Sequence, residues 1–104
     1  MKVVYSLKAR QDLIDIMHYI AFELLSPEAA HHTAGRIMEA VRSLAVMPER
    51  NPLYKEEPWR SLGIRFVPAQ NYLVFYMVDA ETVSVVRILY GGRDVSRQLG
   101  ETGR

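Results

Sequence analysis

The longest apolar stretches of the chain lie between Leu62 and Tyr90, where short polar segments divide them into three runs. The runs cover residues 62–67, 71–78 and 82–90, and they are rich in β-branched and aromatic side chains. This pattern predicts three consecutive strands of an antiparallel meander. Side chains alternate between the two faces of a strand. In the second run both faces are apolar, which indicates a strand covered on both sides.

The N-terminal half of the chain shows the periodicity of amphipathic helices. A first strand is predicted over residues 2–5, followed by a helix over about residues 7–24 with Ser6 as its N-cap. Ser26 and Pro27 are typical of the start of a second helix, and the short link between the two helices predicts an antiparallel hairpin. The two predicted apolar stripes are Leu13, Ile16, Met17, Ile20 and Leu24, and Ala30, Ala34, Ile37, Val41 and Leu44.

The predicted elements follow in the order β-α-α-β-β-β, and a charged C-terminal tail follows Gly91 and Gly92. We therefore expect an α+β fold in which an N-terminal α-helical hairpin packs on a small antiparallel β-sheet, as a single domain over residues 1–104. Two helices can cover only one face of such a sheet. The second face has to be covered by the tail, by the proline-rich segment 48–61 or by another chain.

Composition narrows the classes of protein further. The chain has no cysteine, a net charge of +1 and no run of apolar residues long enough to span a membrane. Disulfide frameworks and thiolate metal sites are excluded, and the near-neutral charge does not indicate a nucleic-acid binder. The N-terminus lacks the pattern of a signal peptide, so we expect a cytoplasmic protein without membrane association.

No metal or cofactor site is expected from the sequence. The histidines His18, His31 and His32 lack the i, i+4 spacing of helical metal pairs, and the one such pair, Glu28 with His32, supplies only two ligands. Phosphate-binding loops and nucleophile motifs are absent as well. Two pairs of carboxylates are interpreted as solvated surface groups: Asp12 with Asp15, and Glu56 with Glu57.

Arginines in and after the strands are the candidate functional residues. Arg65 and Arg87 lie within apolar runs, where an arginine needs either a partner or a task at a surface. Two interpretations of Arg87 are open: a functional role, or a structural pairing with Asp94 or Glu57 that holds the tail. The candidate site residues are Arg93, which follows the glycine pair, with Arg65, Arg87 and Tyr90.

Three segments together resemble a known superfamily: VVYSLKARQDLIDIMHYIAFE, IRFVPAQNYLVFYMVD and VVRILYGGRD. They are similar to the RelE/ParE superfamily of type II toxins, also called plasmid stabilization proteins, over nearly the whole chain. The resemblance implies a small antiparallel sheet packed by a helical hairpin. It also implies an addiction module, in which a cognate antitoxin binds the growth-inhibiting toxin as a hetero-oligomer and keeps it inactive.

The superfamily has two classes of target, and the site residues separate them. RelE-like members cleave mRNA in the ribosome without metal, whereas ParE-like members inhibit DNA gyrase. The arginine that follows the RelE glycine turn corresponds to Arg93. The positions of the other RelE catalytic residues hold Ile64, Phe66, Leu73 and Leu99, whose side chains have no ionisable group. The resemblance therefore favours the ParE-like branch.

The chemistry of RNA cleavage supports the same preference. Metal-free cleavage needs a base for the 2′-hydroxyl and an acid for the leaving oxygen. The chain has neither lysine nor histidine after Lys55, and arginine stays protonated. Tyr90, Asp94 or Glu57 could serve only with large pKa shifts, and His18 could serve only if the fold brings it to the site. A ribosome-dependent endoribonuclease with a diverged site is the alternative function, and a non-toxic remnant or interaction module is the third.

Overall fold

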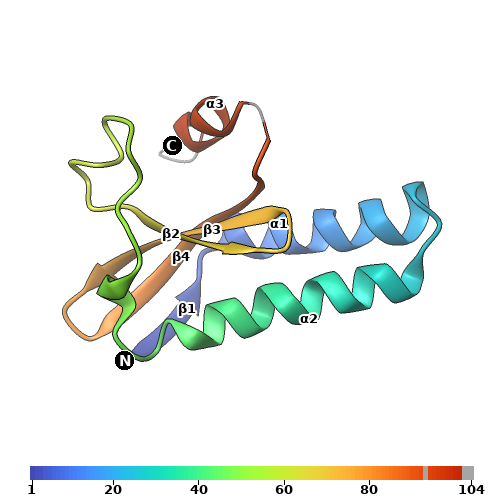
Figure 1. Cartoon of the computed structure of the whole chain (residues 1–104), viewed down its shortest axis with the longest axis horizontal. Coiled ribbons are helices and arrows are strands. Elements are labelled where there is room, and N and C mark those ends of the chain that lie inside the picture. The colour runs from blue at the N-terminus through green and yellow to red at the C-terminus, as the bar shows by residue number, and fades with distance from the viewer. Residues whose placement is uncertain (93, 102–104) are drawn as a thin grey trace.

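The computed structural model describes residues 1–92 and 94–101 and has an α+β architecture (Figure 1). The observed order of secondary-structure elements confirms the predicted β-α-α-β-β-β order, and a short additional helix lies in the tail. The elements are β1 (Lys2–Tyr5), α1 (Leu7–His18), a π-helical turn (Tyr19–Glu23), α2 (Pro27–Ser43), a 3-10 turn (Pro48–Arg50), β2 (Arg65–Ala69), β3 (Tyr72–Asp79), β4 (Thr82–Tyr90) and α3 (Val95–Gly100).

The sheet is mixed, with strand order β1-β4-β3-β2. Strands β2, β3 and β4 form the predicted antiparallel meander. Strand β1 instead pairs in parallel with β4, with Val3 opposite Val83. The expected antiparallel sheet is therefore confirmed for β2, β3 and β4, and the β1–β4 pair is the exception. This pair is parallel because the helical hairpin carries the chain back before the meander begins. A parallel pair needs such a crossover connection.

Strand β4 contains an irregularity that strict alternation does not predict. Val85 and Arg87 lie opposite neighbouring residues of β3, so Val86 is an extra residue in β4. As a result Val85 and Ile88 lie in one core cluster, whereas Val86 and Leu89 pack in the other. A β-bulge of this kind changes the face to which the following side chains point.

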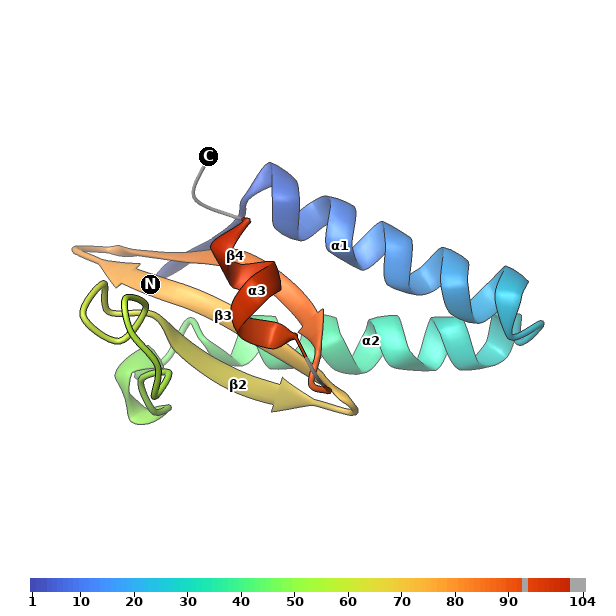
Figure 2. The ribbon, with the colours of Figure 1, turned by 90° about the horizontal axis from the view of Figure 1, so that it is seen from above.

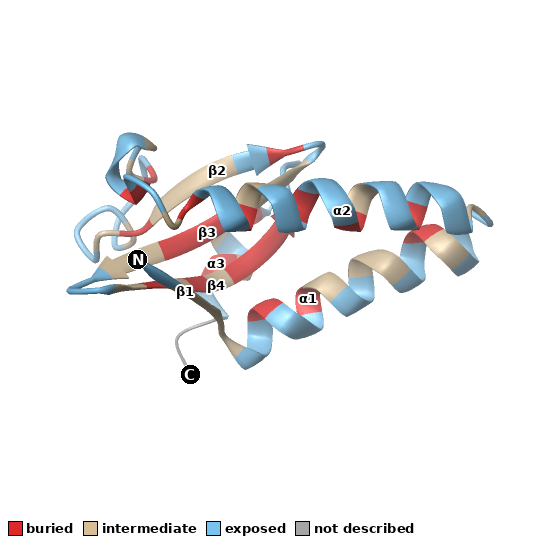
Figure 3. Ribbon diagram, turned by 90° about the horizontal axis from the view of Figure 1, so that it is seen from below, coloured by how far each residue is buried: buried red, intermediate tan, exposed pale blue. Residues whose placement is uncertain are grey.

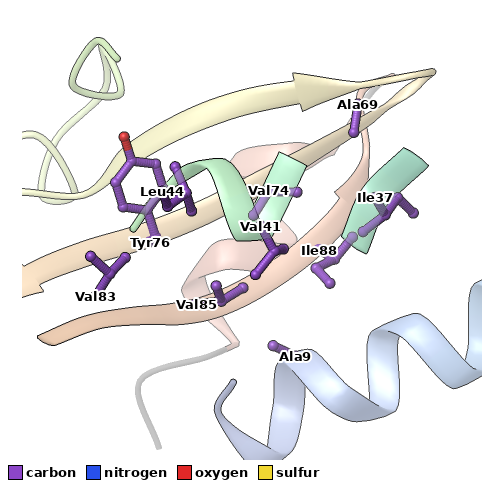
Figure 4. Packing of buried hydrophobic residues seen from close by; sticks show 10 residues of the cluster. All are labelled: Ala9, Ile37, Val41, Leu44, Ala69, Val74, Tyr76, Val83, Val85 and Ile88. Carbon is purple, nitrogen blue, oxygen red and sulfur yellow. The ribbon is translucent and has the colours of Figure 1, made fainter. Parts of the chain in front are cut away.

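The helical hairpin packs on one face of the sheet, as predicted. Ser6 accepts a hydrogen bond from the Ala9 amide at 2.9 Å, and Ser26 accepts one from the Ala29 amide at 3.3 Å. Both serines therefore act as the predicted N-caps. The ten buried residues of this core are shown in Figure 4: Ala9, Ile37, Val41, Leu44, Ala69, Val74, Tyr76, Val83, Val85 and Ile88.

The far end of the hairpin extends beyond the end of the sheet (Figure 2). The predicted helix over about residues 7–24 is confirmed in extent, because α1 continues at Tyr19 into a π-helical turn that ends at Glu23, and only the geometry of this last turn differs from an α-helix. Leu24 was expected in the core but is 56 % exposed, since no strand lies beneath it. The outer surfaces of both helices carry mainly exposed residues (Figure 3).

The second face of the sheet is covered by the chain itself. Helix α3 lies on the side opposite α2, and the proline-rich segment packs beside α3 (Figure 1). Two of the three predicted covers, the tail and the proline-rich segment, are therefore confirmed. The buried residues of this second core are Tyr54, Ile64, Phe75, Leu89, Val95 and Leu99.

Candidate functional site

Arg87 is buried in an ion pair with Asp12 of α1. Its Nε and Nη2 donate to the two carboxylate oxygens of Asp12 at 2.7 and 3.0 Å, and its Nη1 donates to the Gln98 carbonyl at 2.9 Å. Arg87 is 5 % exposed and Asp12 is 8 % exposed. The described contacts of Arg87 therefore link α1, β4 and α3, and they do not involve the expected Asp94 or Glu57.

Asp12 was expected to be a solvated surface carboxylate, and that interpretation is wrong. It lies about one turn after Ala9 and one turn before Ile16, so α1 directs it towards the sheet. Its Oδ2 also accepts a hydrogen bond from the Ile88 amide at 2.9 Å. A carboxylate on a core-facing stripe that meets an arginine in a strand would have been the sequence signal for this pair.

Arg65 holds the proline-rich segment to the edge strand. Its Nη1 donates to the carbonyls of Asn51 at 2.6 Å and Glu49 at 3.2 Å. Leu53 forms a bridge opposite Arg65, which continues the attachment of this segment to β2. The described hydrogen bonds of Arg65 therefore give it a structural role, which is to hold the proline-rich segment against β2.

A groove of about 800 Å³ lies where the overhanging hairpin meets the end of the sheet. Tyr90 is 58 % exposed at this groove, and its ring meets that of Tyr72 edge to face at 5.8 Å. A smaller hollow beside it includes Gly91 and Gly92. The groove is lined by Asp15, Ile16, Tyr19, Ile20, Leu24, Ala29, Thr33, Gln70, Asn71, Tyr72 and Tyr90.

Gly92 lies directly against the ring of Tyr90. A Cβ atom at Gly92 would come within 2.7 Å of the Tyr90 Cε2 atom, closer than real Cβ contacts allow. A side chain at this position would therefore push the ring away. The glycine next to β4 lets Tyr90 lie across the backbone that leaves the sheet.

Electrostatics in the groove are dominated by tyrosine hydroxyls and one carboxylate. Burial raises the pKa of Tyr72, and the neighbouring hydroxyls of Tyr19 and Tyr90 raise that pKa further. Tyr72 therefore stays protonated and neutral near pH 7. Asp15 is the only charged side chain that lines the groove within the described residues.

The remaining candidate, Arg93, lies outside the described residues. The flanking Asp94 has a positive φ of 68°, and α3 begins at the next residue. Of the four predicted site residues, only Tyr90 lines the groove among those described. Sequence reasoning missed Asp15, Tyr19 and Tyr72 as neighbours of Tyr90, because they come from separate elements. Amphipathic tyrosines at element ends were the available signal.

The described residues offer neither a metal-binding cluster nor a membrane-spanning helix. Residues 1–92 and 94–101 contain no group of three or more histidine or acidic side chains that could hold a metal ion. Within the same part of the chain, every helix is too short or too polar to cross a bilayer.

Comparison with known proteins gives one matching family and several similar folds. Residues 3–95 match the family model described as the ParE toxin of the type II toxin-antitoxin system, parDE. Among solved structures, a chain of the chromosomal ParDE toxin-antitoxin system from P. aeruginosa is similar, with a TM-score of 0.71 and 23 % identity over 88 % of this chain and 97 % of that one.

The RelBE2 toxin-antitoxin complex from Mycobacterium tuberculosis provides a second similar fold. It matches with a TM-score of 0.61 and 20 % identity over 86 % of this chain and 95 % of that one. A search of curated proteins gives no significant match. Because the family model covers most of its length, the chain belongs to the ParE toxin family of type II toxin-antitoxin systems.

Proposed function

We propose that this toxin acts by binding and inhibiting DNA gyrase and that a cognate antitoxin protein neutralises it in a hetero-oligomer. The observation that carries the choice of target is the lack of RNA-cleaving chemistry around Tyr90, the one described candidate residue that is exposed at a groove. The described lining of this groove contains no lysine, arginine or histidine. Phosphate recognition depends on cations, and proton transfer near neutral pH depends mainly on groups such as histidine.

The other candidate residues give no support to mRNA cleavage. Arg87 is occupied by Asp12 in the core, and Arg65 is occupied by loop carbonyls. Among the candidate residues, only Tyr90 and the undescribed Arg93 are left to act on a substrate. A RelE-like endoribonuclease remains the alternative only through Arg93, the one position that matches its catalytic set.

Antitoxin binding is supported by the apolar surface of the hairpin end. Phe22 and Leu25 are 69 % and 82 % exposed, and Tyr19 and Leu24 beside them are more than half exposed. Clustered exposed side chains of this size mark interaction sites in soluble proteins. The second face of the sheet is covered internally, so the hairpin end and its groove are the surfaces best suited to a partner. The proposal places the toxin in the cytoplasm, where its target acts.

The test measures both target reactions with the same purified chain. Supercoiling of relaxed plasmid by gyrase is expected to fall as toxin is added, while mRNA on programmed ribosomes stays intact. Toxin premixed with an excess of its antitoxin is the control, and it should leave supercoiling unchanged. Codon-phased cuts in the mRNA with unaffected supercoiling would reverse the assignment.

A further inference from the structure

The hairpin end differs in charge from the rest of the molecule. Between Arg10 and Arg36 the sequence contains no lysine and no arginine, although the whole chain carries a net charge of +1. The same stretch contains Asp12, Asp15, Glu23 and Glu28, of which only Asp12 is neutralised by a described ion pair. The overhanging end of the toxin is therefore an apolar surface with an excess of negative charge.

Asp15 is the one acidic residue of this stretch among the described residues that line the groove. It lines the groove with Tyr19, Tyr72 and Tyr90. Its Oδ1 accepts a hydrogen bond from Gln11 Nε2 at 2.8 Å, which holds the carboxylate in place. No described lysine or arginine lies within ion-pair distance of Asp15.

A carboxylate next to several aromatic rings attracts one chemical group in particular. Guanidinium and ammonium groups are drawn to the faces of aromatic rings and to carboxylates at the same time. The tyrosine hydroxyls add acceptors for the N–H groups of such a cation. Anions are disfavoured, because the described lining of the groove offers no positive side chain to balance them.

From this arrangement we infer that the groove is a docking site for an apolar segment of the antitoxin that carries one arginine or lysine. The cation lies between Asp15 and the rings of Tyr72 and Tyr90. Its apolar neighbours cover Tyr19 and Leu24 at the hairpin end. The inference rests on the proposed antitoxin binding and specifies the chemistry that the antitoxin presents to this groove.

The antitoxin, and not the target, is the expected occupant because of the apolar area involved. Leu24 lines the groove and is 56 % exposed, and the next residue, Leu25, is 82 % exposed. Apolar surface of this kind promotes association if it is left uncovered. The antitoxin covers this surface for as long as the toxin is neutralised, whereas contact with the target is transient. The antitoxin is therefore the occupant that fits a large apolar surface.

The first experiment compares two variants with the same change in net charge. Asp15→Asn removes the carboxylate of the groove, and Asp79→Asn removes an exposed carboxylate at the β3–β4 turn, at the opposite end of the molecule (Figure 2). The probe is the product of the adjacent reading frame, titrated calorimetrically into each purified toxin. We expect Asp15→Asn to weaken binding about tenfold, and Asp79→Asn to weaken it less than about twofold.

A second variant tests the aromatic part of the site. Tyr90→Leu keeps an apolar side chain but removes the ring and its hydroxyl, and we expect a loss of about fivefold or more in affinity. Leu62→Ala, which changes a side chain that is 57 % exposed in the proline-rich segment, is the matched control and should bind like the wild type. Circular dichroism of each variant verifies that the fold is retained.

A peptide pair separates this inference from the proposed function. The probes are acetyl-Leu-Arg-Leu-Leu-amide and its citrulline counterpart, which has the same shape without the charge. The arginine peptide should shift the NMR signals of the Tyr72 and Tyr90 rings, the citrulline peptide should shift them much less, and Asp15→Asn should abolish the difference. Equal shifts from both peptides would overturn the cation site, whatever the antitoxin does.

The remaining outcomes assign the groove to another occupant. If Asp15→Asn keeps its affinity for the antitoxin but no longer inhibits gyrase, the groove belongs to the target and the inference is wrong. If the variant changes only the oligomeric state of the toxin alone, the occupant is a second copy of this chain. If the wild-type toxin binds no adjacent product, the proposed antitoxin binding fails, and the peptide result alone decides whether the groove binds a cation.

Discussion

The carboxylate of Asp12 and the guanidinium of Arg87 form a two-point ion pair inside the protein, with Arg87 Nε 2.7 Å from Asp12 Oδ2. The pair joins the first long helix to the last strand, and a further bond from Arg87 to the Gln98 carbonyl extends the link to α3. Arg87 thus attaches a helix from each of the two covering layers, α1 and α3, to the sheet.

Removing one member of the buried pair should destabilise the protein strongly. Asp12→Ala leaves the charge of Arg87 buried without this partner and removes the acceptor of the Ile88 amide. We expect the free energy of unfolding to fall by roughly 3–5 kcal/mol. Urea unfolding measures it, with Asp15→Ala on the exposed side of the same helix as the control, for which about 0.5 kcal/mol or less is expected. Equal losses in the two variants would show that the ion pair is not a structural link.

Helix α3 should depend on Leu99 for its attachment to the sheet. Leu99 is 2 % exposed, and Leu99→Ala removes its contacts with the second core, at an expected cost of roughly 2–5 kcal/mol. Trp59 packs against the same core and next to Gly100, so its fluorescence should shift to the red as α3 loosens. The exposed neighbour Arg97→Ala is the control and should leave the emission unchanged. An unshifted spectrum in Leu99→Ala would mean that α3 is held by its other contacts.

Alkaline pH should destabilise the protein through three tyrosines, of which Tyr76 is buried and Tyr5 and Tyr72 are partly buried. Burial raises the pKa values of Tyr5, Tyr72 and Tyr76 above the usual tyrosine value. A group whose pKa is higher in the folded state stabilises that state fully below the unfolded pKa, near about 10, and loses this contribution as pH rises through the folded pKa. The temperature of unfolding should therefore fall above about pH 10. Absorbance at alkaline pH should show these three tyrosines ionising above the usual tyrosine pKa, and a single tyrosine transition near that usual value would contradict the assignment.

Arg93→Ala should weaken toxicity more than folding. Arg93 lies outside the described residues, and its position after Gly91 and Gly92 predicts a side chain presented at a surface. Losing an exposed arginine changes stability by about 0.5 kcal/mol or less, whereas losing an interface arginine can cost about 2 kcal/mol or more of binding. Melting of the mutant–antitoxin complex and growth of cells expressing the mutant alone are measured together, with Arg97→Ala as the control.

Two results would contradict the role assigned to Arg93. A mutant that melts several degrees lower, and is weakly toxic only because little of it folds, would make Arg93 a structural residue of the tail. A mutant that melts normally and remains fully toxic would remove it from the functional site altogether.

Local patterns in the sequence predicted most of the secondary structure. All five predicted stripe residues of the second helix are buried as the helical periodicity indicated, and Ile37, Val41 and Leu44 lie in the first core. Both serine caps form their hydrogen bonds. The polar breaks before and after β3 were likewise sufficient to predict the meander. These features depend on neighbours a few residues apart, which is the range over which a sequence pattern carries information.

The site was less accessible to sequence reasoning because it is assembled from separate elements. Tyr90 was identified at the end of a strand, but its neighbours Tyr19 and Asp15 come from the hairpin and Tyr72 from the adjacent strand. Arg65 and Arg87 were identified as candidates because each is a cation within an apolar run, where a charged side chain needs a partner. Their partners, Asn51 and Asp12, are recognisable only once the chain is folded.

The order of elements, the apolar stripes of the helices and the absence of cysteine chemistry were predictable from the residues alone, because propensity, periodicity and composition are read directly from the chain. The parallel pairing of β1 with β4, the bulge at Val86 that changes the faces of β4, and the burial of Asp12 became apparent only in the folded protein. These outcomes depend on which segments meet across long stretches of chain. An aspartate such as Asp12 can lie in solvent or in the core, and it is buried here because the fold brings Arg87 next to its carboxylate.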